Sequence, residues 1–587
     1  MQKTILFKIL DLRRKYISNH TFLIIAAIIV GIASSFAAIL LKTFVHFLRN
    51  VSESFHQYNI YNVWLFVLPI AGILISTIIL KLLYKKKTDK GLGGILYAIS
   101  HKSSKVEGKK TYSHILTSGI TIGLGGSAGL EAPIAITGSA IGSNISDLFM
   151  LGQKERTILL ACGAASGIAS VFNSPIAGVI FAMEVLLTEF SIPSFIPLLI
   201  STASATIISK LLYGGQLFYL ISNEWYFNAI PFYIFLGILC GLISVYMKRV
   251  TLSLEEYFDN RKDNKRILFG LVLTGLLIFI FPPLFGEGYN SIDVLLTGNY
   301  YETLDNSLFS NFSYDPWFII MFAVFIVFLK VVATALTIGS GGNGGIFAPS
   351  LFTGAFTGFG LAHLVNTTGI NKLNVSNFIV VGMAGILSGV VHAPLTAIFL
   401  IAEITGGYVL FVPLMIVVAL SYFITRIFEP HSIYTKKLAE TGHLLTGDKD
   451  SNVLMFLNVS EVIEKDFIVL RADKYLNQLI EAFSKSNRTV FPVVNEKEDF
   501  IGVVFLYNVK DLLFEPDLYD KMLIQDLTEK IVTIDIDENM ESVMNKFEKS
   551  NLWNIPVVSG KKYLGFVSRS NIFTYYRNNL KKSNYLL

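Results

Sequence analysis

Charged side chains are scarce in this chain. Asp, Glu, Lys and Arg make up only 16% of its 587 residues, whereas 52% are hydrophobic. Soluble proteins usually carry roughly a quarter charged residues, so this balance excludes an ordinary soluble protein and predicts an integral membrane protein. The net charge of +5 is modest, and the chain has no basic surface run interleaved with aromatic residues, so we expect no nucleic-acid partner.

Cysteine is scarcer still, because only Cys162 and Cys240 occur and both lie in apolar runs. Such residues are typical of buried small side chains rather than of a disulfide or a metal pair. No His, Cys and Asp cluster with ligand spacing lies in the apolar regions, and nothing resembles a nucleophile beside its base. The sequence therefore predicts neither a metal site nor an enzyme.

Long apolar runs predict membrane spans. An amphipathic, basic segment (1–20) precedes the first span, and a cluster of lysines follows the second. By the positive-inside rule both flanks are cytoplasmic. The segment 248–266 is basic and predicts another cytoplasmic loop, whereas 288–313 has no basic residue and predicts an outside loop. The conventional spans are expected at 21–45, 65–83, 192–212, 232–246, 267–285 and 318–336.

Two glycine-rich stretches interrupt the apolar pattern. Gly125–Pro133 reads GGSAGLEAP, and Gly341–Pro349 reads GGNGGIFAP, 216 residues later. The first stretch has Glu131 where the second has Phe347. Glycine leaves backbone N–H groups exposed, and irregular backbone at membrane depth survives only when it is buried in protein or lines a cavity. We expect a small polar site built mostly from backbone.

A second internal match shows that the membrane part is duplicated. Gly163–Glu184 aligns without gaps on Gly382–Glu403, at an offset of 219 residues. The predicted copies span about 63–213 and 229–435, within a membrane domain of residues 21–435. Short segments interrupted by Gly and Pro, as in 112–189, point to helices that end inside the membrane around a transport site. The spacing alone does not distinguish an inverted from a parallel repeat.

The composition changes after Tyr434. A linker is expected at 436–450, followed by a charged α/β tail at 451–587 with no run long enough to span a membrane. The tail contains two similar units, at about 455–513 and 520–578, each with an amphipathic helix followed by two short strands. Each unit is too small to bury much core, so the two are expected to pack together.

Together these motifs resemble the CLC chloride channel and transporter family with a C-terminal tandem CBS domain. The motifs are GLEAP (129–133), GIFAP (345–349), NSP (173–175) with Glu184, HAPLT (392–396) and Tyr434. The resemblance implies an all-α polytopic membrane protein with broken helices, built from an inverted repeat. It also implies a homodimer in the lipid of the cell membrane, with one pathway for chloride or similar anions in each subunit and with the N-terminus and the tail cytoplasmic.

The resemblance also implies roles for individual residues. Glu131 is expected to gate the pathway, its carboxylate occupying an anion site when charged and leaving when protonated; the alternative is a carboxylate that caps a helix start. Phe347 and Tyr434 are expected to line the inner anion site, the tyrosine donating its hydroxyl, although both could be aromatic core residues. The full predicted anion-binding set is Leu92, Gly129, Leu130, Glu131, Gly345, Ile346, Phe347, Ala348 and Tyr434.

Two positions depart from the family pattern. The usual GSGIPE loop, whose serine holds the central anion, corresponds to DKGLGGI at 89–95, where Leu92 or Lys90 falls near the serine. The central site would then depend on backbone N–H groups. Exchangers commonly carry an internal proton-passing glutamate directly after the position of Glu184, but here it is Val185. A passive channel is favoured; the alternative is an anion/proton exchanger that uses water, Glu184 or Glu189.

Glu184 and Glu403 are expected to be structural, bonding to backbone N–H groups near a helix end. The tail has Asn508 and Asn571 where nucleotide-binding CBS units usually have Asp, so an adenine nucleotide is not favoured there and no cofactor is expected. An enzyme or metal transporter, which CBS tails also accompany, is the third class considered.

Overall fold

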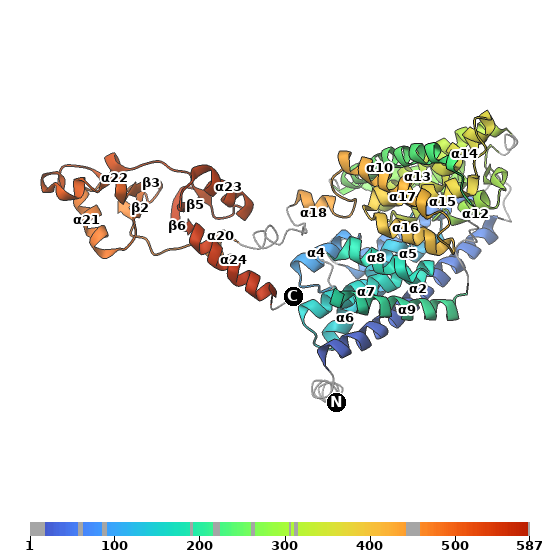
Figure 1. Ribbon diagram of the computed structural model, residues 1–587, viewed down its shortest axis with the longest axis horizontal. Coiled ribbons are helices and arrows are strands. Elements are labelled where there is room, and N and C mark those ends of the chain that lie inside the picture. The colour runs from blue at the N-terminus through green and yellow to red at the C-terminus, as the bar shows by residue number, and fades with distance from the viewer. Residues whose placement is uncertain are drawn as a thin grey trace. The chain divides into compact units, whose positions relative to one another are not determined.

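The chain folds into two compact units, residues 1–444 and 445–587. The computed structural model describes residues 18–56, 63–84, 91–187, 192–214, 224–259, 264–304, 307–309, 315–441 and 458–584. Most of the predicted N-terminal segment (1–20) and of the linker (436–450) lies outside these residues, as do Lys90 and Glu189. Figure 1 shows both units, which are described here in turn.

The first unit is helical throughout its described part (Figure 1). Seven of its described helices are long and apolar enough to cross a membrane. The first copy contains α2 (Asn19–His56), α3 (Trp64–Leu83), α4 (Gly93–His101), α5 (Lys110–Gly123), α6 (Glu131–Leu148), α7 (Gln153–Phe172), α8 (Pro175–Phe181) and α9 (Ile192–Leu212). The second contains α10 (Ile230–Asp259), α11 (Asn264–Ile280), α12 (Tyr289–Leu296), α13 (Pro316–Gly339), α14 (Phe347–Thr368), α15 (Val375–Val391), α16 (Pro394–Ile404) and α17 (Phe411–Phe428), and α18 (Lys436–Glu440) follows.

The two copies have the same internal packing. Helix α2 packs against α7 and α9, as α10 packs against α15 and α17. Helices α6 and α7 form the closest pair of the first copy, as α14 and α15 do in the second. The correspondence therefore begins at α2 and α10. The predicted helical membrane fold with an internal duplication is confirmed.

Glycines allow the closest helix pairs to approach each other. A Cβ added to Gly138 of α6 would lie 2.1 Å from the carbonyl oxygen of Gly163 on α7. In the second copy a Cβ on Gly354 of α14 would lie 2.3 Å from the carbonyl oxygen of Gly382 on α15. Small residues at helix contacts are the usual device for tight packing in membranes. These two pairs hold α6 against α7 and α14 against α15.

The region between α11 and α13 differs from its prediction. The span expected at 267–285 ends at Ile280, because Pro282 and Pro283 cannot continue the helix and form a short 3₁₀ turn instead. The expected outside loop contains a short helix, α12, which begins after Gly288 (φ 89°). Residues just before this helix reach the glycine stretches, as shown below.

The second unit contains two three-stranded sheets. In the first, β2 (Val490–Val494) lies between β1 (Leu470–Arg471), which is parallel to it, and β3 (Phe500–Phe505), which is antiparallel. The second repeats this order with β4 (Ile534–Asp535), β5 (Asn554–Ser559) and β6 (Lys562–Ser568). The main helices are α21 (Leu476–Lys485), α23 (Met540–Ser550) and α24 (Arg569–Asn584), with the short α20 (Val459–Val462) and α22 (Leu506–Val509).

The two small sheets are joined by exchanged backbone pairs. Glu464, which precedes the first sheet, pairs with Phe566 of β6, and Glu529, which precedes the second, pairs with Val503 of β3. The rings of Phe467 and Phe566 also contact each other at a centroid separation of 4.5 Å. Each half of the tail thus contributes a backbone pair to the sheet of the other half. The predicted α/β tail is confirmed.

Candidate functional site

The two glycine stretches meet in the middle of the first unit. Gly129 and Gly345 form an antiparallel bridge, with N–H···O distances of 2.8 Å and 2.7 Å in the two directions. Beside it the Ser127 amide donates to the Thr337 hydroxyl, and the Asn343 amide donates to the Thr121 hydroxyl, both at 3.2 Å. Each partner lies 216 residues from its counterpart, so the contacts obey a local twofold relation between the copies.

The backbone of these stretches requires glycine. Gly125 has φ 101° and its counterpart Gly341 has φ 115°, a conformation that other residues rarely adopt. At the bridge the requirement is space, since a Cβ on Gly345 would lie 2.6 Å from the Cβ of Ala132. The stretches therefore bring the first turns of α6 and α14 together, one from each copy.

Glu131 is the first residue of α6 and is fully buried. One carboxylate oxygen accepts a hydrogen bond from the hydroxyl of Tyr289, the first residue of α12. The other accepts from the backbone N–H of Ala348, at 3.3 Å, in the first turn of α14. The carboxylate of one copy thus lies at the helix start of the other, and does not merely cap its own helix.

The two helix starts at this junction supply hydrogen-bond donors for a negative charge. A helix start carries partial positive charge and unpaired N–H groups, which attract anions without the strong binding of a full cation. Neither 125–133 nor 341–349 contains Lys or Arg. The Glu131 carboxylate is therefore held by the backbone N–H of Ala348 and by the hydroxyl of Tyr289, without a cationic side chain from either stretch.

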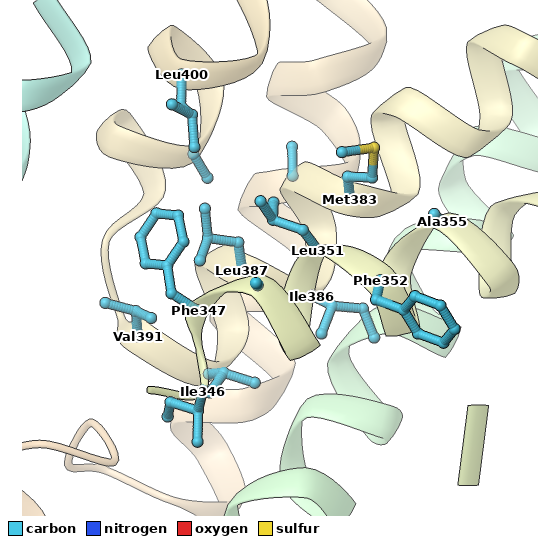
Figure 2. Packing of buried hydrophobic residues seen from close by; sticks show 14 of the residues in the cluster. Ile346, Phe347, Leu351, Phe352, Ala355, Met383, Ile386, Leu387, Val391 and Leu400 are labelled. Atoms are coloured by element: carbon cyan, nitrogen blue, oxygen red, sulfur yellow. The ribbon is translucent and has the colours of Figure 1, made fainter. Parts of the chain in front are cut away.

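Phe347 and Ile346 lie in the hydrophobic core beside this junction. Figure 2 shows the Phe347 ring among Leu387, Val391 and Leu400 of α15 and α16. Phe172 of the first copy packs against the same ring at a centroid distance of 5.7 Å. Phe347 is 1% exposed, so its ring is a buried apolar neighbour of the junction. The next residue of the same helix, Ala348, supplies the N–H that Glu131 accepts.

Tyr434 lies beside the start of α4, and it belongs to the same core cluster as Leu92 and Phe347. A Cβ on Gly93, the first residue of α4, would lie 3.2 Å from the carbonyl oxygen of Tyr434. The Tyr434 side chain is 9% exposed, and its hydroxyl has no hydrogen-bond partner among the residues that the structure describes. A buried hydroxyl without a partner is costly, so this donor is available to a ligand.

Glu184 and Glu403 make reciprocal contacts between α8 and α16. Glu184, just after α8, contacts the start of α16, and Glu403, near the end of α16, contacts the start of α8. The Glu184 carboxylate accepts from the amides of Leu395 (2.9 Å) and Thr396 (2.7 Å) at the start of α16. The Glu403 carboxylate accepts from the amides of Ile176 (3.1 Å) and Ala177 (2.8 Å) at the start of α8. Val185 follows Glu184 in a π-helical turn (Ala182–Leu186) and packs partly buried against the core.

We expect Glu184→Gln to destabilise the first unit. The substitution replaces a charged acceptor at a helix start by a neutral one, which costs about 1–3 kcal/mol. Thermal unfolding in detergent should show a lower midpoint, and Glu403→Gln should lower it similarly because the contacts are reciprocal. Glu440→Gln, at an exposed position of α18, is the matched control. An unfolding midpoint for Glu184→Gln equal to that of this control would contradict the expectation.

Sequence reasoning missed the contribution of the segment 286–289. Glu287 accepts a hydrogen bond from the Leu130 amide at 3.3 Å, and Tyr289 contacts Glu131. The fully buried Lys330 donates to the carbonyl oxygen of Gly286 at 2.8 Å. The only local signal was the pair of glycines in Gly286-Glu287-Gly288, which resembles a tight turn and does not reveal what it touches.

A cavity of about 440 Å³ lies on the same side of Glu131 as this segment. Its lining includes Leu130, Glu287 and Tyr289 together with Lys42, His46 and Arg49 of α2. Lys42 lies 4.3 Å from the ring of Tyr213 and donates to the Val171 carbonyl oxygen. The cavity thus places cationic side chains beside the acidic junction.

No group of three or more His, Cys, Asp or Glu side chains that could hold a metal ion occurs within the described ranges. In the tail, the Asn571 side chain donates to the Val462 carbonyl oxygen at 2.8 Å, and the Asn508 side chain donates to Glu529. Both asparagines at the positions expected to contact a nucleotide therefore have protein partners.

The fold and the site define a multi-pass membrane protein in which two related half-structures meet around a buried carboxylate. Residues 71–426 match the family model of the voltage gated chloride channels, and residues 459–515 and 524–578 match the CBS domain. The chain therefore belongs to the voltage-gated chloride channel (CLC) family and carries a tandem CBS domain, as the motifs predicted.

Named relatives include both channels and exchangers. The chloride channel protein CLC-e of Arabidopsis thaliana is 28% identical over 68% of this chain and 59% of its own length. The H(+)/Cl(−) exchange transporter ClcA of Yersinia pestis is 30% identical over 55% of this chain and 66% of its own length. The crystal structure of a eukaryotic CLC transporter covers 94% of this chain and 97% of its own, with a TM-score of 0.60 and 19% identity, which shows a common fold. In the Arabidopsis and Yersinia relatives the match spans less than two thirds of the protein.

Proposed function

We propose that the first unit carries chloride or a similar small anion across a membrane through a pathway that Glu131 gates. The observation that carries this proposal is the position of the Glu131 carboxylate, which accepts the Ala348 N–H at the start of α14. A carboxylate held there is itself an anion in an anion site. Protonation or displacement of the carboxylate frees the N–H groups for a permeating ion.

The inner part of the pathway runs past Tyr434. Its buried hydroxyl, which lacks a partner among the described residues, supports a role as hydrogen-bond donor to the anion. Leu92 or Lys90 falls near the family's serine and neither offers a hydroxyl, so backbone N–H groups at the start of α4 take its place in this proposal. Conduction needs binding that is weak enough to let the ion leave, and such a site without a full positive charge meets that need.

The flow is channel-like in this proposal. Val185 follows Glu184 where exchangers have a proton-passing carboxylate, and valine cannot carry a proton. Glu184 is already engaged at the start of α16, where it accepts backbone N–H groups, which disfavours it as a substitute. The alternative is an anion/proton exchanger that moves protons through water, and the ClcA relative is named as such an exchanger.

Flux measurements on proteoliposomes that contain the full chain test this function. With a chloride gradient and the membrane voltage clamped by valinomycin and K⁺, we expect chloride to leave and no uphill movement of protons. A pH-sensitive dye inside the vesicles reports the protons. Chloride-driven uphill proton movement would establish the exchanger alternative, and no chloride flux at all would contradict the proposal.

We propose that the protein works as a homodimer in the cell membrane, with the N-terminus and the tail in the cytoplasm. The tail is proposed to contribute dimer contacts and gating without a nucleotide. The hydrogen bonds of Asn508 and Asn571 to protein partners support this reading. Chloride remains the only small ligand of the proposal, and the proposal includes no catalytic reaction.

A further inference from the structure

The segment 286–289 touches the proposed gate at two points. The Tyr289 hydroxyl donates to the Glu131 side chain, and the Glu287 carboxylate accepts the N–H of Leu130, the residue that caps α6 directly before Glu131. Leu130 is 4% exposed, so this N–H has little access to bulk water. A second carboxylate therefore sits beside the gating one and uses a donor of the same helix start.

The segment is held firmly against the first glycine stretch. The Gly286 amide donates to the Gly125 carbonyl oxygen at 3.1 Å. From the other side, the buried ammonium of Lys330 donates to the carbonyl oxygens of Leu284 (3.3 Å) and Gly286 (2.8 Å). Because the backbone on the N-terminal side of Glu287 is fixed in this way, the carboxylate itself is the part that can change partner.

Glu287 also faces the cavity of about 440 Å³ that opens toward Lys42 and Arg49. An anion in this cavity therefore lies among two basic side chains and the Glu287 carboxylate. Glu131 lies behind Leu130, and it is fully buried. Glu287 lines the cavity whereas Glu131 does not, so Glu287 is the carboxylate that an anion in the cavity contacts.

The repeat gives this position a counterpart. Gly288 caps the short helix α12 as Leu92 caps the short helix α4 of the first copy, so Glu287 lies one residue before the cap, where the first copy has Gly91. Leu92 occupies the loop that the family uses for its central anion. The second copy has a carboxylate in the corresponding loop, on the side of the cavity.

We propose that Glu287 is a second carboxylate of the gate, which holds the Leu130 N–H when charged and releases it when protonated or displaced by an anion from the cavity. This inference rests on the proposed anion pathway and adds a residue to it. When charged, Glu287 opposes anion entry by repulsion and by occupying a donor. Acidification on the cavity side therefore increases the anion flux because it protonates Glu287 as well as Glu131.

Several other charged or titratable groups face Glu287. They are Glu131 on α6, Lys42, His46 and Arg49 on α2, Tyr213 after α9, Tyr289 on α12 and Lys330 on α13. Among them, His46 is exposed on the cavity wall and is an independent titratable group of the same cavity. The test must separate its contribution from that of Glu287.

The test measures chloride efflux from proteoliposomes against the pH on the cavity side, for the wild type and for Glu287→Gln. Glutamine mimics the neutral form. We expect flux at alkaline pH, where the wild-type Glu287 is charged, to rise about tenfold, the factor for one hydrogen bond to a charged acceptor. The half-saturating chloride concentration should fall, and the pH profile should become shallower. In a Glu131→Gln background a residual increase on acidification should remain, and adding Glu287→Gln should remove it.

Glu302→Gln, an exposed carboxylate in the same region, and His46→Gln are the controls and should retain the Glu287-dependent part of the profile. A Glu287→Gln profile identical to that of the wild type would overturn the proposal while leaving the anion pathway intact. Absence of wild-type chloride flux would instead contradict the pathway. If Glu287→Gln does not fold, Glu287→Asp is measured instead. Its shorter carboxylate should hold the Leu130 N–H less well and raise the flux at alkaline pH, and a wild-type profile would overturn the proposal.

Discussion

Glu131→Gln should leave the anion pathway open at neutral pH. Glutamine carries no charge, so it does not compete with an anion for the Ala348 N–H, although it nearly matches the shape of glutamate. We expect chloride flux from proteoliposomes at neutral pH to increase by about tenfold or more, because a hydrogen bond to a charged acceptor is worth at least that factor. Most of the dependence of the flux on the pH at the cavity side should disappear as well.

The control for this substitution is Glu107→Gln, at an exposed carboxylate between α4 and α5. It changes the net charge by the same amount and should leave both flux and pH dependence at wild-type values. If Glu131→Gln folds as the wild type does and keeps the wild-type flux and pH profile, Glu131 does not gate the pathway. An enzyme or a transporter of another substrate would then need renewed consideration.

Gly345→Ala should nearly abolish flux. The added Cβ would lie 2.6 Å from the Cβ of Ala132 and 3.2 Å from its amide nitrogen, both in the first turn of α6. Overpacking of this kind costs about 1–3 kcal/mol and pushes the two helix starts apart. We expect chloride flux to fall about 10- to 100-fold, which corresponds to the same energies.

Gly360→Ala is the matched control on the same helix, α14, because its Cβ would meet only the Cβ of Ala323 at an ordinary 3.8 Å. Flux and elution from a sizing column should be unchanged for it. A correctly folded Gly345→Ala protein with wild-type flux would show that the close approach of the two glycine stretches is not needed for transport.

Much of this architecture could be predicted from the sequence because its signals are local. The apolar runs predicted the spans, and the two GG-containing stretches, 216 residues apart, predicted the duplication. The predicted end of one span was wrong. Helix α11 ends at Ile280, because Pro282 and Pro283 follow, and not at residue 285. The tail was predicted from its charged composition and from two pairs of short apolar strands, each preceded by an amphipathic helix, and the two sheets confirm it.

The surroundings of Glu131 could be predicted only in part. The family resemblance implied that the Glu131 carboxylate occupies an anion site, but it did not identify the Ala348 N–H that holds it. The contacts of Glu287 and Tyr289 depend on how the turn before α12 folds back onto Gly125. This long-range contact leaves no pattern in the spacing of residues. Lys330 lies in an apolar run of α13, where a sequence does not show which carbonyl groups a buried ammonium will meet.

A bromide-soaked crystal structure of Glu131→Gln tests the central claim most directly, because bromide can be located by its anomalous scattering. The account predicts a bromide ion at the place of the Glu131 carboxylate, within hydrogen-bond distance of the Ala348 N–H, with the introduced glutamine side chain displaced. No anomalous peak at the junction of α6 and α14, with the glutamine side chain still bound to Ala348, would contradict it.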